Sequence, residues 1–363
     1  MLICKVYAHA WCYTVAMTLR FATDSEIAEW DTHVLTNPDH GNVFQGDLFA
    51  EQKKLGSWRP IYLMADKLAL LVLQKHVIGL GNMWYIPKGP GIDTPRHLTR
   101  VLQDLREFAS KQNVFVVKIE PELPKTEENT KSLTEDGLLH VRPIQPMNST
   151  ILLDLRPELD DILSGLNQKG RHAINRAERD GATVKRVETD DENCRLFYEM
   201  FSTTARAQGF VIRPFEYYAK FWRRYADADM GQMFFTYNGD NLIACGFAMV
   251  FGEKSLYKDA ASIRDGSVYG AGHLMQWEII KWAREQGSKI HDLGGAPPSD
   301  KALDKNHPHY GIGRFKTSFN KEITDWVGAY DMPIKSTQYG IWQKFGERLV
   351  KRFWWKKHGE SWY

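Results

Sequence analysis

The sequence predicts an α/β protein that contains two similar units, each built on a mixed central sheet. The main observation is a repeated order of elements: hairpin, polar loop, helix and apolar strand occur twice along the chain. The length of 363 residues is enough for two domains of ordinary size. The composition, 43% hydrophobic and 25% charged, is that of a folded globular protein.

The first unit begins with a predicted hairpin in "PIYLMADKLALLVLQKHV", in which Asp66 and Lys67 form the polar turn. The segment "MWYIPKGPGID" follows, and then a helix from about Pro95 to Lys111 and the apolar strand "VFVVKI". The polar segment "PELPKTEENTKSLTEDG" is predicted to be a loop. A domain boundary is expected near residue 149, before the strand "TILLDL".

The second unit repeats this order. The stretch "MFFTYNGDNLIACGFAMVFG" predicts a hairpin, because Asn238-Gly239-Asp240 is typical of the turn that joins two antiparallel strands. The segment "KSLYKDAASIRDG" is predicted to be the polar loop, followed by a helix from about Gly272 to Gln286 and the strand "KIHDL". The order of elements, rather than residue identity, therefore predicts an internal duplication.

The cysteines and the N-terminal segment favour a cytosolic protein. The four cysteines form no CxxC pair, which favours a reduced compartment. The apolar N-terminus is interrupted by Lys5 and His9 and is too short to span a bilayer. Residues 1–16 are predicted to be an extension without a role in the fold, so that the first domain begins at Met17.

Two segments are locally basic although the net charge is only +2. The first, residues 169–186, is either a solvated helix face or a contact for the phosphates of a nucleic acid. The second, residues 344–357, places Trp354 and Trp355 among basic residues. It is either an amphipathic packing helix or a contact for a membrane surface or RNA.

Other kinds of site are poorly supported by the sequence. His291, Asp292, His307 and His309 do not form a convincing set of metal ligands, and no GxSxG nucleophile motif occurs. The glycines at 270 and 272, at the start of a predicted helix, either hold the pyrophosphate of coenzyme A or simply permit the turn. We therefore expect no metal and no covalent enzyme intermediate.

The stretch "GIGRFKTSFN" places Lys316 between a glycine-rich turn and an apolar run, at the edge of a predicted core strand. A lysine is costly to bury unless a negative group meets its ammonium. Lys316 therefore either points into solvent or awaits a charge that a substrate brings.

Six motifs, in this order, resemble the Fem family of aminoacyl-tRNA-dependent transferases that build peptidoglycan interpeptide bridges. They are "NVFQGDLFAEQKKLGSW", "YIPKGPGID", "QKGRHAINRAERDGATVKR", "TTARAQGFVIRPFEYY", "HDLGG" and "RFK". The resemblance covers nearly the whole chain from about residue 23. It implies two GNAT-like domains, residues 17–149 with about 328–363, and residues 150–327. No heptad run lies between Ala182 and Val211, so the chain resembles the compact form without a coiled-coil arm.

The resemblance also implies the chemistry. An amine of the peptidoglycan precursor would attack the ester of an aminoacyl-tRNA, which needs no cofactor because the ester is already activated. Lys316 is implied to stabilise the developing oxyanion, and Phe315 to shape the site for the terminal ribose and adenine. Asp259 and Asp292 are the nearest carboxylates by motif, but neither is an obvious general base.

The implied acceptor site rests on four family positions. Arg213 and Tyr217 match residues that hold the precursor diphosphate, and Tyr257 matches a further aromatic position. The family lysine in "FAEQKK" corresponds to Lys53 or Lys54, with Glu51 at another candidate position. Lys258 and Asp259 depart from the family pattern, which leaves the identity of the acceptor open; Asp259 is counted with the acceptor site. The four residues expected to contact tRNA are Lys169, Arg171, Arg176 and Arg179.

The expected partners are aminoacyl-tRNA and a precursor, either lipid II or the UDP-linked pentapeptide. We expect a cytoplasmic monomer, with possible contact at the inner membrane face. Three alternatives stay open: an acyl-CoA-dependent N-acyltransferase, a tRNA-dependent enzyme that acts on a small-molecule amine in antibiotic biosynthesis, and a non-catalytic protein that binds precursor or RNA.

Overall fold

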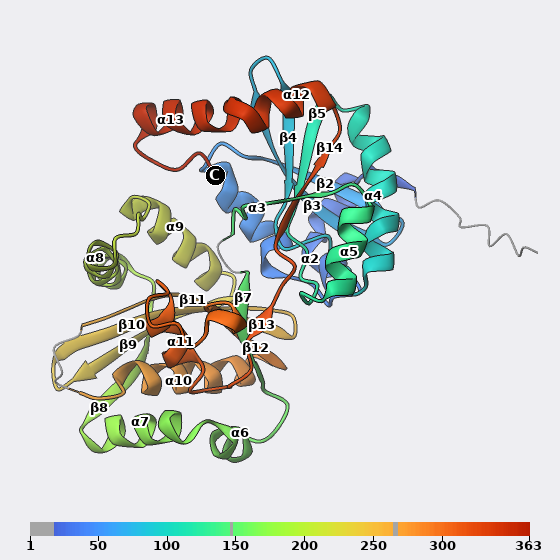
Figure 1. Ribbon diagram of the computed structural model, residues 1–363. Coiled ribbons are helices and arrows are strands. Elements are labelled where there is room, and N and C mark those ends of the chain that lie inside the picture. Colours follow the sequence, from blue (N-terminus) through green and yellow to red (C-terminus); the bar gives the residue numbers. More distant parts are fainter. Residues whose placement is uncertain (1–17, 146–147, 264–267) are drawn as a thin grey trace, which may run out of the picture.

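The computed structural model describes residues 18–145, 148–263 and 268–363 (Figure 1). The extension predicted for residues 1–16 lies outside these ranges. The described chain forms two halves, each with a seven-stranded mixed sheet.

The first sheet has the order β1-β2-β3-β4-β5-β14-β6. Its strands are β1 Leu19–Phe21, β2 Arg59–Ala65, β3 Leu68–Val77, β4 Gly81–Ile86, β5 Val114–Ile119, β6 Leu139–Val141 and β14 Ala329–Pro333. The second sheet has the order β13-β7-β12-β11-β10-β9-β8. Its strands are β7 Ser149–Asp154, β8 Ala182–Val187, β9 Gly231–Asn238, β10 Asn241–Phe251, β11 Lys254–Ser262, β12 Ile290–Gly295 and β13 Thr324–Asp325.

Both sheets contain the same connection. β2, β3 and β4 are antiparallel neighbours, and β4 pairs in parallel with β5 after helix α4 (Pro95–Ser110). β9, β10 and β11 are also antiparallel, and β11 pairs in parallel with β12 after helix α10 (Ala271–Glu285). The predicted repeat of elements is thus confirmed, but β11 was predicted to be loop. Its charged pair Lys258-Asp259 obscures the strand pattern, and pairing with β10 and β12 determines its conformation.

Local signals account for the turns that were predicted. Asp66 in the β2–β3 turn has φ 52°, and Gly239 in the β9–β10 turn has φ 56°, a region that Gly, Asn and Asp enter most easily. Helix α4 begins where the Thr94 side chain accepts a hydrogen bond from the His97 amide, with Pro95 in the first turn.

The helices of the first half are α1 Asp24–Ala28, α2 Trp30–Leu35, the 3-10 helix η1 Val43–Gln45, α3 Asp47–Lys54, α4, α5 Glu127–Glu135, α12 Ser336–Ile341, the π-helical turn η3 Trp342–Gly346 and α13 Glu347–His358. Helix α5 lies in the segment predicted to be a loop. The Thr126 side chain caps it, and Leu133 is buried among the residues that pack against α4. A single buried leucine gave too weak a periodicity to indicate a helix.

The helices of the second half are α6 Leu159–Gly165, α7 Gln168–Arg179, α8 Asp191–Gln208, α9 Phe215–Ala226, α10, the 3-10 helix η2 Ser299–Lys301 and α11 Tyr310–Lys316. Helix α8 ends only six residues before α9 begins, so this region has no coiled-coil arm. None of the helices in the described ranges has the length and apolar content needed to cross a bilayer.

The chain returns to the first half near its end. β13 pairs with β7 in the second sheet, whereas β14, a few residues later, pairs with β5 and β6 in the first. Helices α12 and α13 then cover one face of the first sheet through a cluster that includes Phe115, Tyr339 and Trp342.

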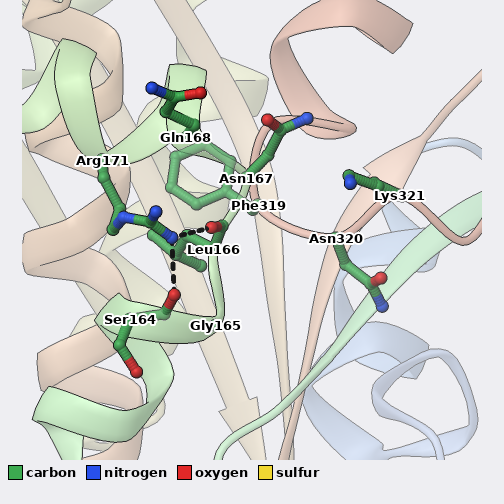
Figure 2. A pocket seen from close by; sticks show the side chains of 9 residues that line it. All are labelled: Ser164, Gly165, Leu166, Asn167, Gln168, Arg171, Phe319, Asn320 and Lys321. Atoms are coloured by element: carbon green, nitrogen blue, oxygen red, sulfur yellow. Dashed lines mark hydrogen bonds between the residues drawn. The ribbon is translucent and has the colours of Figure 1, made fainter.

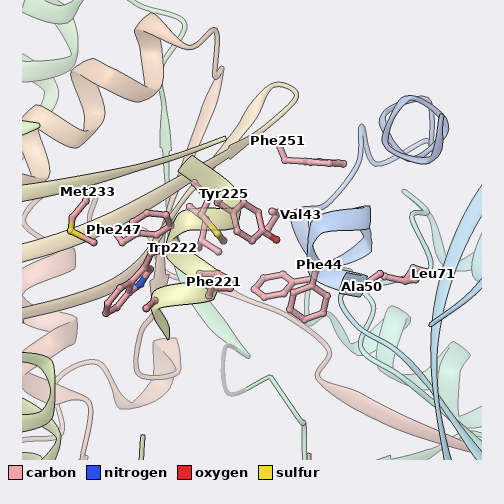
Figure 3. Close-up of a cluster of buried hydrophobic side chains, with 14 of the residues drawn as sticks. Val43, Phe44, Ala50, Leu71, Phe221, Trp222, Tyr225, Met233, Phe247 and Phe251 are labelled. Carbon is pink, nitrogen blue, oxygen red and sulfur yellow. The ribbon is translucent and has the colours of Figure 1, made fainter. Parts of the chain in front are cut away.

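The two halves share one hydrophobic core. Figure 3 shows Phe44 and Leu71 of the first half facing Phe221, Tyr225 and Phe251 of the second within one buried cluster. Hydrogen bonds add to this contact, because the Gln52 amide donates to Tyr217 O at 3.0 Å and Arg224 donates to Gln52 Oε1 at 2.7 Å. A core of this kind fixes the halves relative to each other.

Candidate active site between the two halves

Lys316 is the last residue of helix α11, and not part of a strand edge as its sequence context predicted. The helix lies against the end of β12, which Gly313 permits because a Cβ there would be 2.6 Å from Pro297 Cδ. The Lys316 side chain is buried, and its Nζ donates a hydrogen bond to Gly295 O at 2.8 Å.

A break in strand pairing provides that carbonyl. The register between β12 and β7 shifts between Asp292 and Gly295, so Gly295 pairs with Thr150 outside the regular ladder. The Asp292 carboxylate accepts hydrogen bonds from the Thr150 hydroxyl and, at 2.7 Å, from the Gly294 amide. These contacts fix the Asp292 carboxylate, whose charge acts on the ammonium of Lys316.

The charge state of Lys316 follows from these surroundings. Burial lowers the pKa of Lys316 to about 8, and the carboxylate of Asp292 opposes that shift. Burial also raises the pKa of Asp292, while its hydrogen bond from Thr150 opposes the rise. Lys316 therefore remains mostly protonated at neutral pH without a direct ion pair that would neutralise it.

Phe315, in helix α11, lies beside other aromatic rings. Its ring makes an edge contact with His273 at 4.8 Å between centroids, and His273 stacks on Phe319 at 5.7 Å. Burial lowers the pKa of His273 to about 4, so this imidazole is neutral at physiological pH. The group gives one wall of the site next to Lys316 an apolar surface.

Charged residues of the first half reach the same region. Glu122 and Lys88 both act on the pKa of Asp292, Glu122 raising it and Lys88 lowering it. Lys88 is buried and lies 3.5 Å from Glu122. The "YIPKGPGID" segment therefore contributes a cation to the interface between the halves, close to the Lys316 region.

Glu120 continues this row of charges. It accepts a hydrogen bond from Tyr85 at 2.6 Å, and Lys88 lowers its pKa while burial raises it. Glu120 in turn raises the pKa of Lys53. Alternating charges thus run along the interface from the surroundings of Lys316 toward Lys53.

Lys53 is the member of its lysine pair that faces inward. It is buried on α3, and burial together with the Arg213 cation lowers its pKa to about 8. Lys54 instead forms an exposed ion pair with Glu51. Burial therefore favours Lys53 among these three positions, because it is the one that lies close to the Arg213 cation.

Arg213 and Tyr217 lie together as expected, but Arg213 already has partners within the chain. Its guanidinium lies 4.7 Å from the centre of the Tyr217 ring. It also donates to Glu360 Oε2 at 2.9 Å and to Tyr363 O at 2.6 Å. The segment 359–363, which follows α13, thus occupies the position where the resemblance places a diphosphate.

Lys75 was not identified from the sequence and completes this cluster. Its Nζ donates to Trp362 O and lies within 5 Å of the ring centres of Trp58, Trp354 and Trp362. Burial, with Lys53 and Arg213 nearby, lowers the pKa of Lys75 to about 7. A lysine inside the apolar run "LALLVLQKHV" is the signal that could have revealed it, by the argument used for Lys316.

Tyr257 and Asp259 were expected in one acceptor site, but they face opposite sides of β11. The pairing with β10 shifts at Lys258, so Tyr257 packs against the core near α10 while Asp259 lies under α9. Asp259 accepts from Trp222 Nε1 at 3.1 Å and pairs with Lys258 at 2.9 Å. Its carboxylate thus contacts α9 and Lys258, on the other side of the strand from Tyr257, and the role of both residues in acceptor binding stays a prediction.

The four basic residues of α7 are not part of the interface between the halves. Helix α7 covers the side of the second half that is remote from the first half (Figure 1). Arg176 and Arg179 both lie within 4 Å of Asp180, and Lys169 is exposed. Arg171 donates to Ser164 O at 2.5 Å and to Leu166 O, closing one side of a polar cavity of about 390 Å³ (Figure 2). This cavity also includes Asn167 and Lys321.

The glycine turn before α10 is explained by packing. Gly270 has φ 90°, and a Cβ there would lie 2.1 Å from Ala173 O of α7. A side chain is thus excluded by backbone conformation and by contact, and α7 covers the turn. Among the described residues, no group of three His, Cys, Asp or Glu side chains could hold a metal ion.

Comparison with known proteins is consistent with this geometry. Residues 26–138 match the model of the FemAB family, and residues 167–302 match the model of an acetyltransferase (GNAT) domain. One similar protein is the UDP-N-acetylmuramoylpentapeptide-lysine N(6)-alanyltransferase of Weissella viridescens, 27% identical over 336 residues that cover 87% of this chain and 96% of the relative. Another is the lipid II:glycine glycyltransferase of Staphylococcus aureus, 23% identical over 407 residues that cover 89% and 95%.

The fold is also that of solved structures. The crystal structure of FemX superimposes with a TM-score of 0.75 at 20% identity and covers 91% of this chain and 100% of FemX. The structure of L-PGS from Bacillus licheniformis gives a TM-score of 0.52 at 15% identity, covering 90% and 98%. The expected pair of GNAT-like domains is confirmed. The two sheets, the family match over residues 26–138 and the similarity to bridge-forming transferases along most of the chain together support membership of the Fem family.

Proposed function

We propose that this chain transfers an amino acid from aminoacyl-tRNA to the stem-peptide amine of a peptidoglycan precursor. The observation that carries the proposal is the buried ammonium of Lys316, which donates to Gly295 O near the interface of the halves and whose pKa the charge of Asp292 raises against the effect of burial. The substrate class comes from the names of the two relatives. One is named for a UDP-linked pentapeptide acceptor and the other for lipid II.

In the proposed reaction the precursor amine attacks the ester carbonyl of the aminoacyl-tRNA. A C–N bond forms, the ester C–O bond breaks, and the proton lost by the amine passes to the ribose oxygen that leaves. Among the described residues, Gly295 O is the only hydrogen-bond acceptor of Lys316 Nζ. The remaining N–H groups of the ammonium are therefore available to stabilise the tetrahedral oxyanion.

Asp292 is proposed as a positioning residue and not as the base. Its carboxylate accepts from Thr150 and from the Gly294 amide, and its charge keeps Lys316 protonated. Phe315, against His273 and Phe319, provides an apolar surface suited to stacking with the terminal adenine of tRNA.

The acceptor diphosphate is proposed to bind at the cluster of Lys53, Lys75, Arg213 and Tyr217. Three cations gathered with few anions favour a phosphate ligand, and the Arg213 fork suits its oxygens. The diphosphate would replace Glu360 and Tyr363 O on Arg213. We further propose that the enzyme needs no cofactor, acts as a monomer and works in the cytoplasm or at the inner membrane face.

The test uses the purified chain with charged total tRNA and, in separate reactions, a UDP-linked pentapeptide or lipid II. The expected result is a mass gain on the peptide that RNase abolishes. Lys316→Met should abolish most of this gain, whereas Lys321→Met, at an exposed lysine nearby in the sequence, should not. A mass gain on the peptide when acetyl-CoA replaces the charged tRNA would contradict the proposal, and so would full activity of the Lys316→Met variant.

The acyl-CoA alternative is less well supported. It requires a pyrophosphate at the Gly270 turn, and α7 covers that turn. Isothermal titration with coenzyme A is expected to show no saturable binding.

A further inference from the structure

The outer face of the C-terminal helix pair carries an apolar row that no other described segment covers. Residues 336–358 form one almost continuous helix, in which α12 and α13 are joined by the π-helical turn η3. Its inner face packs Trp342, Val350 and Trp354 against the first sheet. Figure 1 shows α13 along the outer rim of the first half, so its other face is open.

Four apolar side chains line this open face at intervals of four residues. Ile341, Phe345, Leu349 and Phe353 are 37%, 49%, 47% and 68% exposed. Residues at this spacing lie in one row along a helix, so they form a continuous stripe. A further apolar side chain, Ile78, is 93% exposed in the β3–β4 turn, which approaches η3 where Leu80 faces Gly346.

A row of cations runs beside this stripe. Its members, at the same interval, are Lys344, Arg348, Arg352 and Lys356. All four are exposed, and within the described ranges none forms an ion pair. By contrast, Glu347 is paired with Lys351 at 2.7 Å and accepts from Tyr363 Oη at 2.7 Å. The only carboxylate of α13 is thereby held away from the basic row.

An anionic membrane surface matches both rows at once. An interfacial helix inserts an apolar stripe among lipid chains while its flanking lysines and arginines meet anionic headgroups. RNA would match the cations and could stack on Phe345 and Phe353, but the aliphatic side chains Ile341 and Leu349, which alternate with these rings, offer a base no stacking surface. A protein partner would have to present an acidic row beside an apolar groove to match both rows.

We propose that the Ile341–Phe353 stripe and the adjacent basic row form a docking surface for an anionic lipid bilayer. The proposal deepens the function above, because it names the surface that would bring the enzyme to a lipid-linked acceptor. The segment 359–363 connects this helix directly to Arg213 of the proposed diphosphate site. Docking places that site next to the membrane from which a lipid-linked diphosphate projects.

The experiment is co-sedimentation of the full chain with vesicles of phosphatidylcholine, alone or mixed with phosphatidylglycerol. Binding should rise about tenfold or more with phosphatidylglycerol and fall with added salt. Phe345→Ser with Phe353→Ser should reduce binding about tenfold, and Arg348→Glu with Arg352→Glu should abolish the dependence on anionic lipid. Leu303→Ser, at a residue that is 91% exposed elsewhere, and Lys169→Glu with Arg179→Glu on α7 are the matched controls.

Several outcomes would overturn the proposal. They are equal binding to neutral and anionic vesicles, unchanged binding of the helix variants, or loss of tRNA binding in the charge variants with vesicle binding intact. A dimer in light scattering that Phe353→Ser dissociates would assign the face to a second copy. Activity on the soluble UDP-linked acceptor should be unchanged in the helix variants, so failure of docking and failure of the transferase proposal are distinguishable.

Discussion

At the scale of single residues, Lys316 has the clearest physical rationale. Burial lowers the pKa of the residue to about 8, and the charge of Asp292 opposes this shift, so that the ammonium stays mostly protonated at neutral pH. Replacing it by methionine removes one charged donor from the oxyanion. We expect kcat to fall about 10²- to 10³-fold with a smaller change in KM, measured in the tRNA-dependent assay.

The pKa of Lys316 also predicts a pH dependence. The protonated form stabilises the oxyanion, and the pKa is lowered to about 8, so the rate should decline as pH rises through about 8. Lys316→Arg keeps a cation that does not deprotonate in this range and should move the decline to higher pH. A decline at an unchanged pH in that variant would assign it to another group.

Substitutions of Lys53 and of its neighbour Lys54 provide a test and a matched control for the proposed acceptor site. Lys53→Met removes a buried cation from the cluster, whereas Lys54→Met removes an exposed one that pairs with Glu51. We expect the KM for the UDP-linked acceptor to rise about tenfold or more in the first variant only. Equal effects would show that the cluster does not bind the diphosphate.

At the scale of elements, the segment 359–363 competes with the acceptor for Arg213. Glu360→Gln removes the negative charge from Arg213 while retaining the shape of the side chain. We expect the acceptor KM to fall about fivefold, measured against Glu107→Gln on the exposed face of α4 as control. A rise in KM would mean that Glu360 orients Arg213 for binding.

The elements also show what the sequence can and cannot predict. The hairpins, α4 and α10 follow from local signals, such as the Asn238-Gly239 turn and the Thr94 cap, that act within a few residues. The strand β11 and the helix at Lys316 depend on pairing and packing with distant segments, and were assigned wrongly. The aromatic surroundings of Lys75 could not be predicted, because Trp58, Trp354 and Trp362 meet only in the folded chain.

The site residues divide in the same way. Lys53, Arg213, Tyr217, Phe315 and Lys316 were predicted through motifs, and the structure places them all in the region of the interface, while their roles stay predictions. Asp259 was counted with Tyr257 in the acceptor site through its place in the motif, and a regular strand would put two such alternate residues on one face. The shift at Lys258 reverses that relation, and no local pattern in the sequence announces it.

At the scale of the whole molecule, the shared core predicts that the halves unfold together. Phe221→Ala would leave a cavity between Tyr225 and Phe247, where the rings now lie 4.9 and 6.1 Å away. We expect a loss of about 3–5 kcal/mol in the free energy of unfolding, in one cooperative transition followed by circular dichroism. Phe353→Ala, at an exposed ring, should change stability by less than about 0.5 kcal/mol. Two separate transitions in the parent protein would contradict the shared core.

The buried cluster that contains Phe44 of the first half and Phe221 of the second has a consequence for substrate choice. Because the shared core fixes the halves relative to each other, the distance between the proposed diphosphate cluster and the ammonium of Lys316 is constant. The protein would therefore select its acceptor by length. Precursors would then be sorted by the number of bonds between their phosphates and their nucleophilic nitrogen. A stem peptide shortened by one residue before that nitrogen would bind normally and yet fail to react.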